Sequence, residues 1–213
     1  MSEFPEWLRP LVEAAASVDP ASIMVPPEDT DGLRESAVLI LFGEGSDGPD
    51  VLLLRRSEGL RHHPGQPAFP GGGIDPTDAG PEAAALREAQ EETGLEPAGV
   101  EVLLTMPQLF LPPSGNLVTP VIAWWREPSE VTPVDQVEVA AVARVPIAAL
   151  ADPANRVMVS HPLRFDSPGF EVAGMLVWGF TAGILDQLLR LGGWERPWDR
   201  TVTVPFPIPS PRT

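Results

Sequence analysis

Residues Phe69–Leu95 read FPGGGIDPTDAGPEAAALREAQEETGL, and this stretch decides the fold. Its second half, Pro81–Thr93, predicts a helix, because proline suits the first helical position and the alanines and leucine that follow favour helix formation. Gly94 then provides the residue type that most readily ends a helix. The first half contains three consecutive glycines, so we expect a turn of unusual backbone freedom to lead into the helix.

Three carboxylates share one face of this predicted helix. Glu88, Glu91 and Glu92 stand at positions i, i+3 and i+4, where like charges cost roughly a few tenths of a kcal/mol per pair. A divalent cation would offset this repulsion, and an all-oxygen ligand set suits Mg²⁺, Mn²⁺ or Ca²⁺. Taken alone, the acidic segment is more simply explained as a solvated helix face, and the triple glycine as an ordinary turn. Their combination favours a site for a metal ion and an anion.

The composition excludes several kinds of chemistry and partner. The 213-residue chain has no cysteine, which rules out thiol catalysis, disulfides and cysteine-ligated zinc, and it has no tyrosine to act as a catalytic acid. Its formal net charge of −16 disfavours a nucleic-acid partner. No apolar run approaches the roughly 18 residues of a membrane-spanning helix, and the first residues lack the order of a signal peptide. We therefore expect a cytoplasmic protein that binds neither nucleic acid nor membranes.

The remaining apolar patterns predict a mixed sheet flanked by helices. Ala37–Phe42 and Val51–Leu54 are apolar runs joined by a Gly/Asp-rich turn, which predicts a β-hairpin covered on both faces. Further strands are expected at Val100–Leu104, Leu117–Trp125 and Val137–Val145, and helices at Pro5–Val18 and Phe180–Leu191. Because strands and helices alternate irregularly, we expect an α+β fold, an α/β/α sandwich, with short N- and C-terminal extensions.

The glycine turn and the acidic helix together resemble the Nudix box, in which a glycine precedes an acid and then Arg-Glu-x-x-Glu-Glu-x-Gly. The matching residues are Gly72, Asp78, Arg87, Glu88, Glu91, Glu92, Gly94 and Leu95. Asp78 stands where glutamate is commoner, and one extra residue separates it from Arg87. Counting from Gly73 restores the spacing but places Ala79 at the acidic position. Both departures resemble the coenzyme A pyrophosphatase branch of the family.

A second motif, directly before the box, resembles the signature of that branch, L-L-x-x-R-S/A-x-x-x-R-x-x-x-G-x-x-x-F-P-G-G. The matching residues are Leu52, Leu53, Arg56, Ser57, Arg61, Gly65, Phe69, Pro70, Gly71 and Gly72. Leu54 and Pro67 depart from the pattern, and Pro67 restricts any strand there to an edge or an interruption. The arginine fork matches phosphate oxygens, which favours a ligand-binding or a structural role for Arg56 and Arg61. His62 and His63 are expected to be loop residues rather than metal ligands.

The resemblance implies a Nudix fold over residues 35–195, preceded by an N-terminal helix and connector (1–34) and followed by a Pro-rich tail (196–213). It implies a homodimer that uses Mg²⁺ or Mn²⁺ to hydrolyse coenzyme A, or a derivative, to 3′,5′-ADP and (acyl-)4′-phosphopantetheine. The implied metal ligands are Glu88, Glu91, Glu92, Gly72 and Glu138, and the implied substrate contacts are Arg56, Arg61, Phe69, Gly71 and Gly72. Glu88 or Glu91 would act as the base, and Arg87 would orient a box glutamate. Glu138 is explained equally well as an exposed strand acid.

Other functions remain open at this point. A Nudix pyrophosphatase could act instead on ADP-ribose, NADH or nucleoside triphosphates, and the signature before the box is what separates these from coenzyme A. A non-catalytic Nudix module that senses a nucleotide usually loses box glutamates, whereas this chain keeps all three. A purely structural domain would leave the repulsion on the acidic helix face uncompensated.

Overall fold

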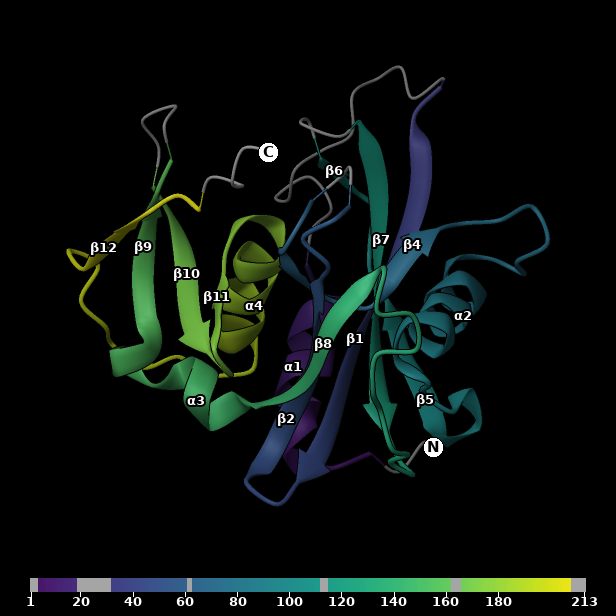
Figure 1. The fold of residues 1–213 in the computed structure, drawn as a ribbon. Coiled ribbons are helices and arrows are strands. Elements are labelled where there is room, and N and C mark those ends of the chain that lie inside the picture. The colour runs from purple at the N-terminus through teal and green to yellow at the C-terminus, as the bar shows by residue number, and fades with distance from the viewer. Residues whose placement is uncertain (1–3, 19–31, 61–62, 112–114, 162–165, 208–213) are drawn as a thin grey trace.

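The computed structural model describes residues 4–18, 32–60, 63–111, 115–161 and 166–207 (Figure 1). The larger sheet contains β1 (Arg34–Gly45), β2 (Gly48–Arg56), β3 (Pro67–Ala68), β4 (Gly71–Gly73), β5 (Val100–Thr105), β6 (Leu109–Leu111), β7 (Asn116–Trp125) and β8 (Val139–Pro146). The smaller sheet contains β9 (Arg156–Ser160), β10 (Asp166–Val172), β11 (Met175–Val177) and β12 (Thr203–Pro205). The helices are α1 (Arg9–Ala16), α2 (Pro81–Thr93), α3 (Ile147–Ala151) and α4 (Gly179–Leu191), with 3-10 turns at Glu6–Leu8, Pro97–Gly99 and Pro153–Asn155.

The larger sheet is mixed, as the sequence predicts. β1 and β2 form the expected antiparallel hairpin, in which Phe42 lies opposite Val51. β1 also pairs in parallel with β7, from Arg34 beside Asn116 onward. The middle of each of these three strands is buried, which explains why their apolar residues are continuous rather than alternating. Pro67 lies in the two-residue strand β3 at the edge of the sheet, where a missing backbone N–H is tolerated.

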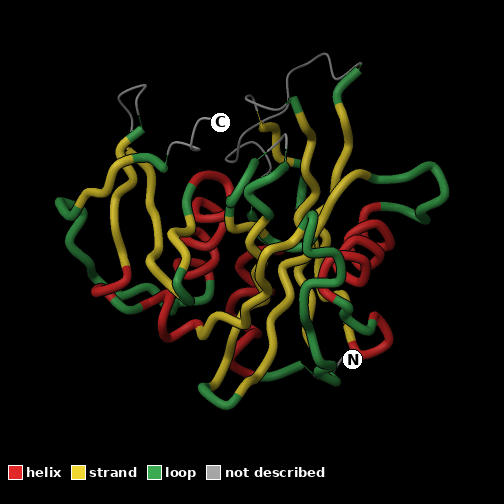
Figure 2. The backbone as a smooth tube through the Cα atoms, in the orientation of Figure 1, coloured by secondary structure: helices red, strands yellow, loops and turns green. Residues whose placement is uncertain are grey.

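Helices cover both faces of the larger sheet (Figures 1 and 2). On one face, α2 packs the small side chains of Ala85 and Ala89 into a core with Leu39 and Leu41 of β1. On the other face, α1, α3 and α4 share a second core with β1, β2, β7 and the smaller sheet. This arrangement is the expected α/β/α sandwich. Among the described helices, none combines the length and apolarity that crossing a bilayer requires.

Helix α2 begins at Pro81 and ends at Thr93, which confirms the predicted bounds. Gly94 adopts the left-handed conformation, with φ of 71°, and its N–H donates to the Gln90 carbonyl. This ending favours glycine because the left-handed region penalises a Cβ. The three glycines before the helix do not form the expected turn: Gly71–Gly73 is strand β4, which pairs antiparallel with β1, and the chain turns toward α2 only after it.

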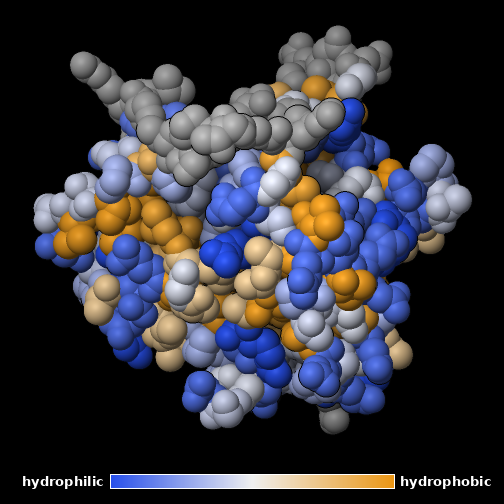
Figure 3. Space-filling model, viewed as in Figure 1, coloured by the Kyte–Doolittle hydropathy of each residue, from blue (hydrophilic) through white to orange (hydrophobic). Residues whose placement is uncertain are grey.

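The smaller sheet is the part of the fold that the sequence patterns did not predict. β10 contains Pro168 and Gly169, which interrupt a strand pattern. The turn between β10 and β11 places Ala173 at a φ of 51°, a conformation that normally calls for Asn or Gly. β12 comes from the Pro-rich segment and pairs in parallel with β9. Hydrophobic residues gather on the surface over this sheet (Figure 3).

Candidate active site

Arg87 lies at the centre of the acidic face of α2. Its Nη1 donates hydrogen bonds to Glu88 at 3.0 Å and to Glu91 at 3.1 Å. Its Nε and Nη2 donate hydrogen bonds to the two oxygens of the Asp78 carboxylate at 3.1 and 3.0 Å. Nη2 also donates to the Gly73 carbonyl at 3.0 Å. The hydrogen bond from Arg87 lowers the pKa of Asp78, and the same bond raises the pKa of Arg87. One guanidinium thus joins Gly73 of β4 to two of the box carboxylates.

Glu92 is the most buried of the three helix carboxylates, with 7% of the residue exposed. Its Oε2 accepts a hydrogen bond from the Gly71 N–H at 2.9 Å, and its Oε1 lies 3.7 Å from Arg56 Nη1. Burial raises the pKa of Glu92 to about 7 against the opposing effects of these two partners. The negative charges of Glu88 and Glu138 raise the pKa of Glu92 further. Glu138 therefore interacts electrostatically with the carboxylate cluster, which consists of Glu88, Glu91 and Glu92.

Gly71 and Gly72 are needed for different reasons. A Cβ on Gly72 would overlap the Glu88 carboxylate, which is the far end of a flexible side chain. A Cβ on Gly71 would instead overlap the Ala37 carbonyl oxygen, which belongs to the backbone of β1. The first glycine of the pair therefore serves the packing of β4 on β1, and the second leaves room for the carboxylate.

Alanine substitutions should separate these two requirements. We expect Gly71→Ala to lower the free energy of unfolding by about 1–3 kcal/mol, because the overlap can be relieved only by moving a strand. Gly72→Ala should cost less stability, because the Glu88 side chain can rotate away, and should instead weaken Mg²⁺ binding. Urea unfolding and a Mg²⁺ titration measure the two effects, and an equal loss of stability in both variants would contradict the distinction.

The carboxylate cluster fits a hard divalent cation in its donor types but not in its present side-chain positions. Oxygen donors from Glu88, Glu91, Glu92 and a backbone carbonyl are what Mg²⁺ or Mn²⁺ prefers. Burial also raises the pKa of Glu88, so a cation there would relieve a desolvated charge. Within the described ranges, however, no three acidic or histidine side chains are grouped to hold one ion. Arg87 contacts one oxygen of Glu88 and one of Glu91, which leaves the second oxygen of each carboxylate for a cation once the side chains move together.

The raised pKa of Glu92 predicts how the metal-free protein responds to pH. Glu92 binds its proton more tightly when folded, with a pKa of about 7, than when unfolded, with a pKa of 4.5. This contribution to stability is complete below pH 4.5 and is lost as the pH rises through 7. Glu92→Gln should remove the dependence and stabilise the protein at alkaline pH by up to roughly 3 kcal/mol, at about 1.4 kcal/mol per pKa unit. Urea unfolding in EDTA at about pH 5.5 and 8.5 measures the free energy of unfolding of the wild-type protein and of Glu92→Gln. If the two proteins differed by the same amount at both pH values, the prediction would be contradicted.

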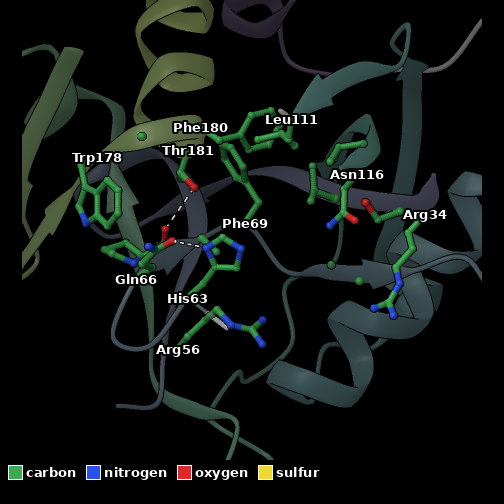
Figure 4. Close-up of a pocket in the computed structure, with 18 of the residues that line it drawn as sticks. Arg34, Arg56, His63, Gln66, Phe69, Leu111, Asn116, Trp178, Phe180 and Thr181 are labelled. Carbon is green, nitrogen blue, oxygen red and sulfur yellow. Dashed lines mark hydrogen bonds between the residues drawn. The ribbon is translucent and has the colours of Figure 1, made fainter. Parts of the chain in front are cut away.

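A cavity of about 660 Å³ opens beside the cluster (Figure 4). Its size lies within the range of small-molecule sites, roughly 300–1,000 Å³. Arg56, Gly71 and Gly72 border both the carboxylate cluster and the cavity, and Phe69 contributes an apolar wall. His63 also lines the cavity, and its Nδ1 lies 2.9 Å from Gln66 Oε1.

The structure brings most of the predicted site residues together. Arg87 forms hydrogen bonds with Glu88 and Glu91. Phe69, Gly71, Gly72 and Arg56 line the cavity, and Arg56 pairs with Glu92. Arg61 and His62 lie outside the described residues. Sequence reasoning missed several cavity residues, among them Arg34, Asn116, Trp178, Phe180 and Phe206. These positions belong to no short motif, and only the tertiary fold assembles them.

Comparison with known proteins identifies the family. A sequence profile of the NUDIX domain matches residues 32–162. The chain belongs to the Nudix hydrolase family. It is 40% identical over 173 residues to a protein of Escherichia coli strain K12 named "Uncharacterized Nudix hydrolase NudL", covering 75% of this chain and 83% of that one. The protein of the same name from Klebsiella pneumoniae strain 342 is 41% identical over 167 residues, with the same coverage.

Solved Nudix structures confirm the fold. The Nudix hydrolase RenU of M. smegmatis matches with a TM-score of 0.54 at 22% identity, covering 78% of this chain and 90% of that one. A Nudix hydrolase from Alicyclobacillus acidocaldarius matches with a TM-score of 0.50 at 18% identity, covering 74% and 91%. Nudix hydrolases generally act on small-molecule substrates with divalent cations such as Mg²⁺ or Mn²⁺.

Proposed function

We propose that this Nudix hydrolase cleaves the diphosphate bond of coenzyme A or an acyl derivative, giving 3′,5′-ADP and (acyl-)4′-phosphopantetheine. One observation carries the proposal: Arg56 and the Gly71–Gly72 pair, which belong to the signature before the box, lie where the carboxylate cluster meets the cavity. A diphosphate held at this junction would sit beside the carboxylates, and its two substituents would extend into the cavity. Arginine suits the diphosphate oxygens there because its planar fork pairs with two of them.

The site residues take the following proposed roles. Glu88, Glu91 and Glu92 would hold Mg²⁺ or Mn²⁺ together with the Gly72 carbonyl, and Glu138 would supply a further ligand. When bound, the ion offsets charge on the diphosphate oxygens and lowers the pKa of a water.

For the chemical step, we propose that Glu88 or Glu91 removes a proton from the attacking water. The water oxygen bonds to one phosphorus, the bridging P–O bond breaks, and the leaving phosphate oxygen retains the electron pair. Arg87 acts as a positioning residue, since its Nη1 donates to both candidate bases. Arg56 and Phe69 are proposed to contact the substrate, as is Arg61, which lies outside the described residues.

A substrate panel tests this proposal. We expect kcat/KM with Mg²⁺ or Mn²⁺ to be highest for coenzyme A or an acyl derivative and lower for ADP-ribose, NADH and nucleoside triphosphates. A preference for ADP-ribose or NADH would show that the proposed substrate is wrong, while the assignment as a Nudix pyrophosphatase would stand. Tight nucleotide binding without hydrolysis of any diphosphate would instead indicate a sensing module.

A further inference from the structure

The cavity has one polar end, formed by β1 and β7. Arg34 and Asn116 lie side by side there as partners in the parallel strand pair, and both line the cavity. Most described arginines form ion pairs, but Arg34 forms neither an ion pair nor a side-chain hydrogen bond within the described part of the chain. Glu35 also lines this end of the cavity, and its carboxylate accepts a hydrogen bond from Gln108 Nε2 at 3.1 Å rather than pairing with Arg34. An arginine without a carboxylate partner in so acidic a chain is available to an anionic ligand.

The opposite end of the cavity is aromatic. The Trp178 ring meets the Phe206 ring edge-on, with centroids 4.5 Å apart, and Phe206 meets His161 in the same way at 4.3 Å. Phe206 is fixed in place by its backbone N–H, which donates to the Ser160 carbonyl at 3.1 Å just after β12. Trp178 and Phe206 lie beyond residue 162, where the match to the NUDIX profile ends, whereas His161 lies within the matched residues.

The diphosphate position proposed above lies between these two ends. In Figure 4, Arg34 and Asn116 lie on one side, Trp178 lies on the other, and Arg56 and His63 lie between them. Arg34 and Arg56 are the arginines among the described residues that line the cavity, so the aromatic end has none. The two ends therefore suit different chemical groups, a phosphate at one and an uncharged arm at the other.

Coenzyme A has two unlike substituents on its diphosphate. One is an adenosine that carries a 3′-phosphate dianion, and the other is the uncharged pantetheine arm. An aromatic ring could stack on adenine, but His161 is the nearest candidate cation at that end among the described cavity residues, whereas Arg34 at the polar end carries a permanent charge. We propose that the substrate lies across the cavity with its 3′-phosphoadenosine toward Arg34 and Asn116 and its pantetheine arm against Trp178 and Phe206. This orientation rests on the proposed function.

The polar end is tested by comparing coenzyme A with dephospho-coenzyme A, which lacks only the 3′-phosphate. We expect the wild-type protein to favour coenzyme A by about 10–100-fold in kcat/KM, the effect of one charge-assisted hydrogen bond. Arg34→Gln should bring this ratio close to one, chiefly by raising KM for coenzyme A. Arg126→Gln is the matched control, because Arg126 pairs with Glu127 on the surface and does not line the cavity.

The aromatic end is tested with Phe206→Ala and Trp178→Ala, using the two product fragments as inhibitors. Both variants should weaken inhibition by 4′-phosphopantetheine and leave inhibition by 3′,5′-ADP close to that of the wild type. They should also leave the ratio between coenzyme A and dephospho-coenzyme A unaltered. Thermal unfolding of each variant shows whether the smaller sheet is intact.

The outcomes separate the orientation from the activity. If the wild-type protein cleaves both substrates and Arg34→Gln lowers both rates equally, the orientation is wrong and the proposed function stands. If the preference for coenzyme A over dephospho-coenzyme A is lost in Trp178→Ala and Phe206→Ala but kept in Arg34→Gln, the substrate lies in the opposite orientation. If the wild-type protein cleaves neither substrate with Mg²⁺ or Mn²⁺, the proposed function itself fails.

Discussion

Glu91→Gln is expected to lower Mg²⁺-dependent hydrolysis by about 10²–10³-fold while leaving the fold intact. A metal contact in a phosphoryl-transfer site contributes several kcal/mol to the barrier, and about 1.4 kcal/mol corresponds to a factor of ten. The Glu91 side chain is 57% exposed and pairs with Arg87 alone among the described residues. Its loss should therefore cost at most about 1 kcal/mol of stability, as for other surface ion pairs.

Glu82→Gln is the matched control for this variant. Glu82 lies in the first turn of the same helix, where its carboxylate accepts a hydrogen bond from Thr105 Oγ1 rather than from Arg87. This control should retain wild-type turnover. For Glu91→Gln, recovery at high Mg²⁺ concentration would indicate a ligand role, and an unrecovered loss would indicate the base. Wild-type turnover at all Mg²⁺ concentrations would refute both roles.

Asp186→Ala is expected to cost the largest amount of stability, about 3–5 kcal/mol. Asp186 on α4 is hydrogen-bonded to Arg156 on β9, whose side chain is fully buried. The Arg156 guanidinium also lies 4.5 Å from the Phe170 ring and 4.4 Å from the Trp198 ring. Desolvation lowers the pKa of Arg156, and the Asp186 charge opposes this shift. Removing the carboxylate would leave the buried Arg156 cation without its hydrogen-bonded ion-pair partner, with the charge of Glu195 as the remaining favourable influence.

The exposed half of the same cluster provides the comparison. Arg190 pairs with Asp186 at 3.1 Å, but its side chain is 52% exposed. Arg190→Ala should therefore lower the free energy of unfolding by only about 0–1 kcal/mol. Urea unfolding of the two variants measures the difference. If Asp186→Ala were no more destabilising than Arg190→Ala, the buried pair would not be what fixes the smaller sheet to α4.

Local signals in the sequence sufficed for the parts of the fold that depend on neighbouring residues. Pro81 and Gly94 determine where α2 begins and ends, and helical spacing alone places its carboxylates on one face. The smaller sheet was missed because Gly169 interrupts β10 and Ala173 takes a conformation that its residue type disfavours. Such positions depend on tertiary packing, which overrides local preference.

The candidate site shows the same division between local and long-range information. The ion pairs of Arg87 with Glu88 and Glu91 follow from spacing on one helix. Its pair with Asp78 depends on how the loop folds back, nine residues away in sequence. The two ends of the cavity are assembled from residues as distant as Arg34 and Phe206. No pattern within a single segment could have joined them.

Product analysis of coenzyme A, with Mg²⁺ present or chelated by EDTA, tests the proposed activity most directly. We predict equal amounts of 3′,5′-ADP and 4′-phosphopantetheine with Mg²⁺, and neither product with EDTA. Intact coenzyme A after incubation of the folded protein with Mg²⁺ or Mn²⁺ would contradict the proposed function.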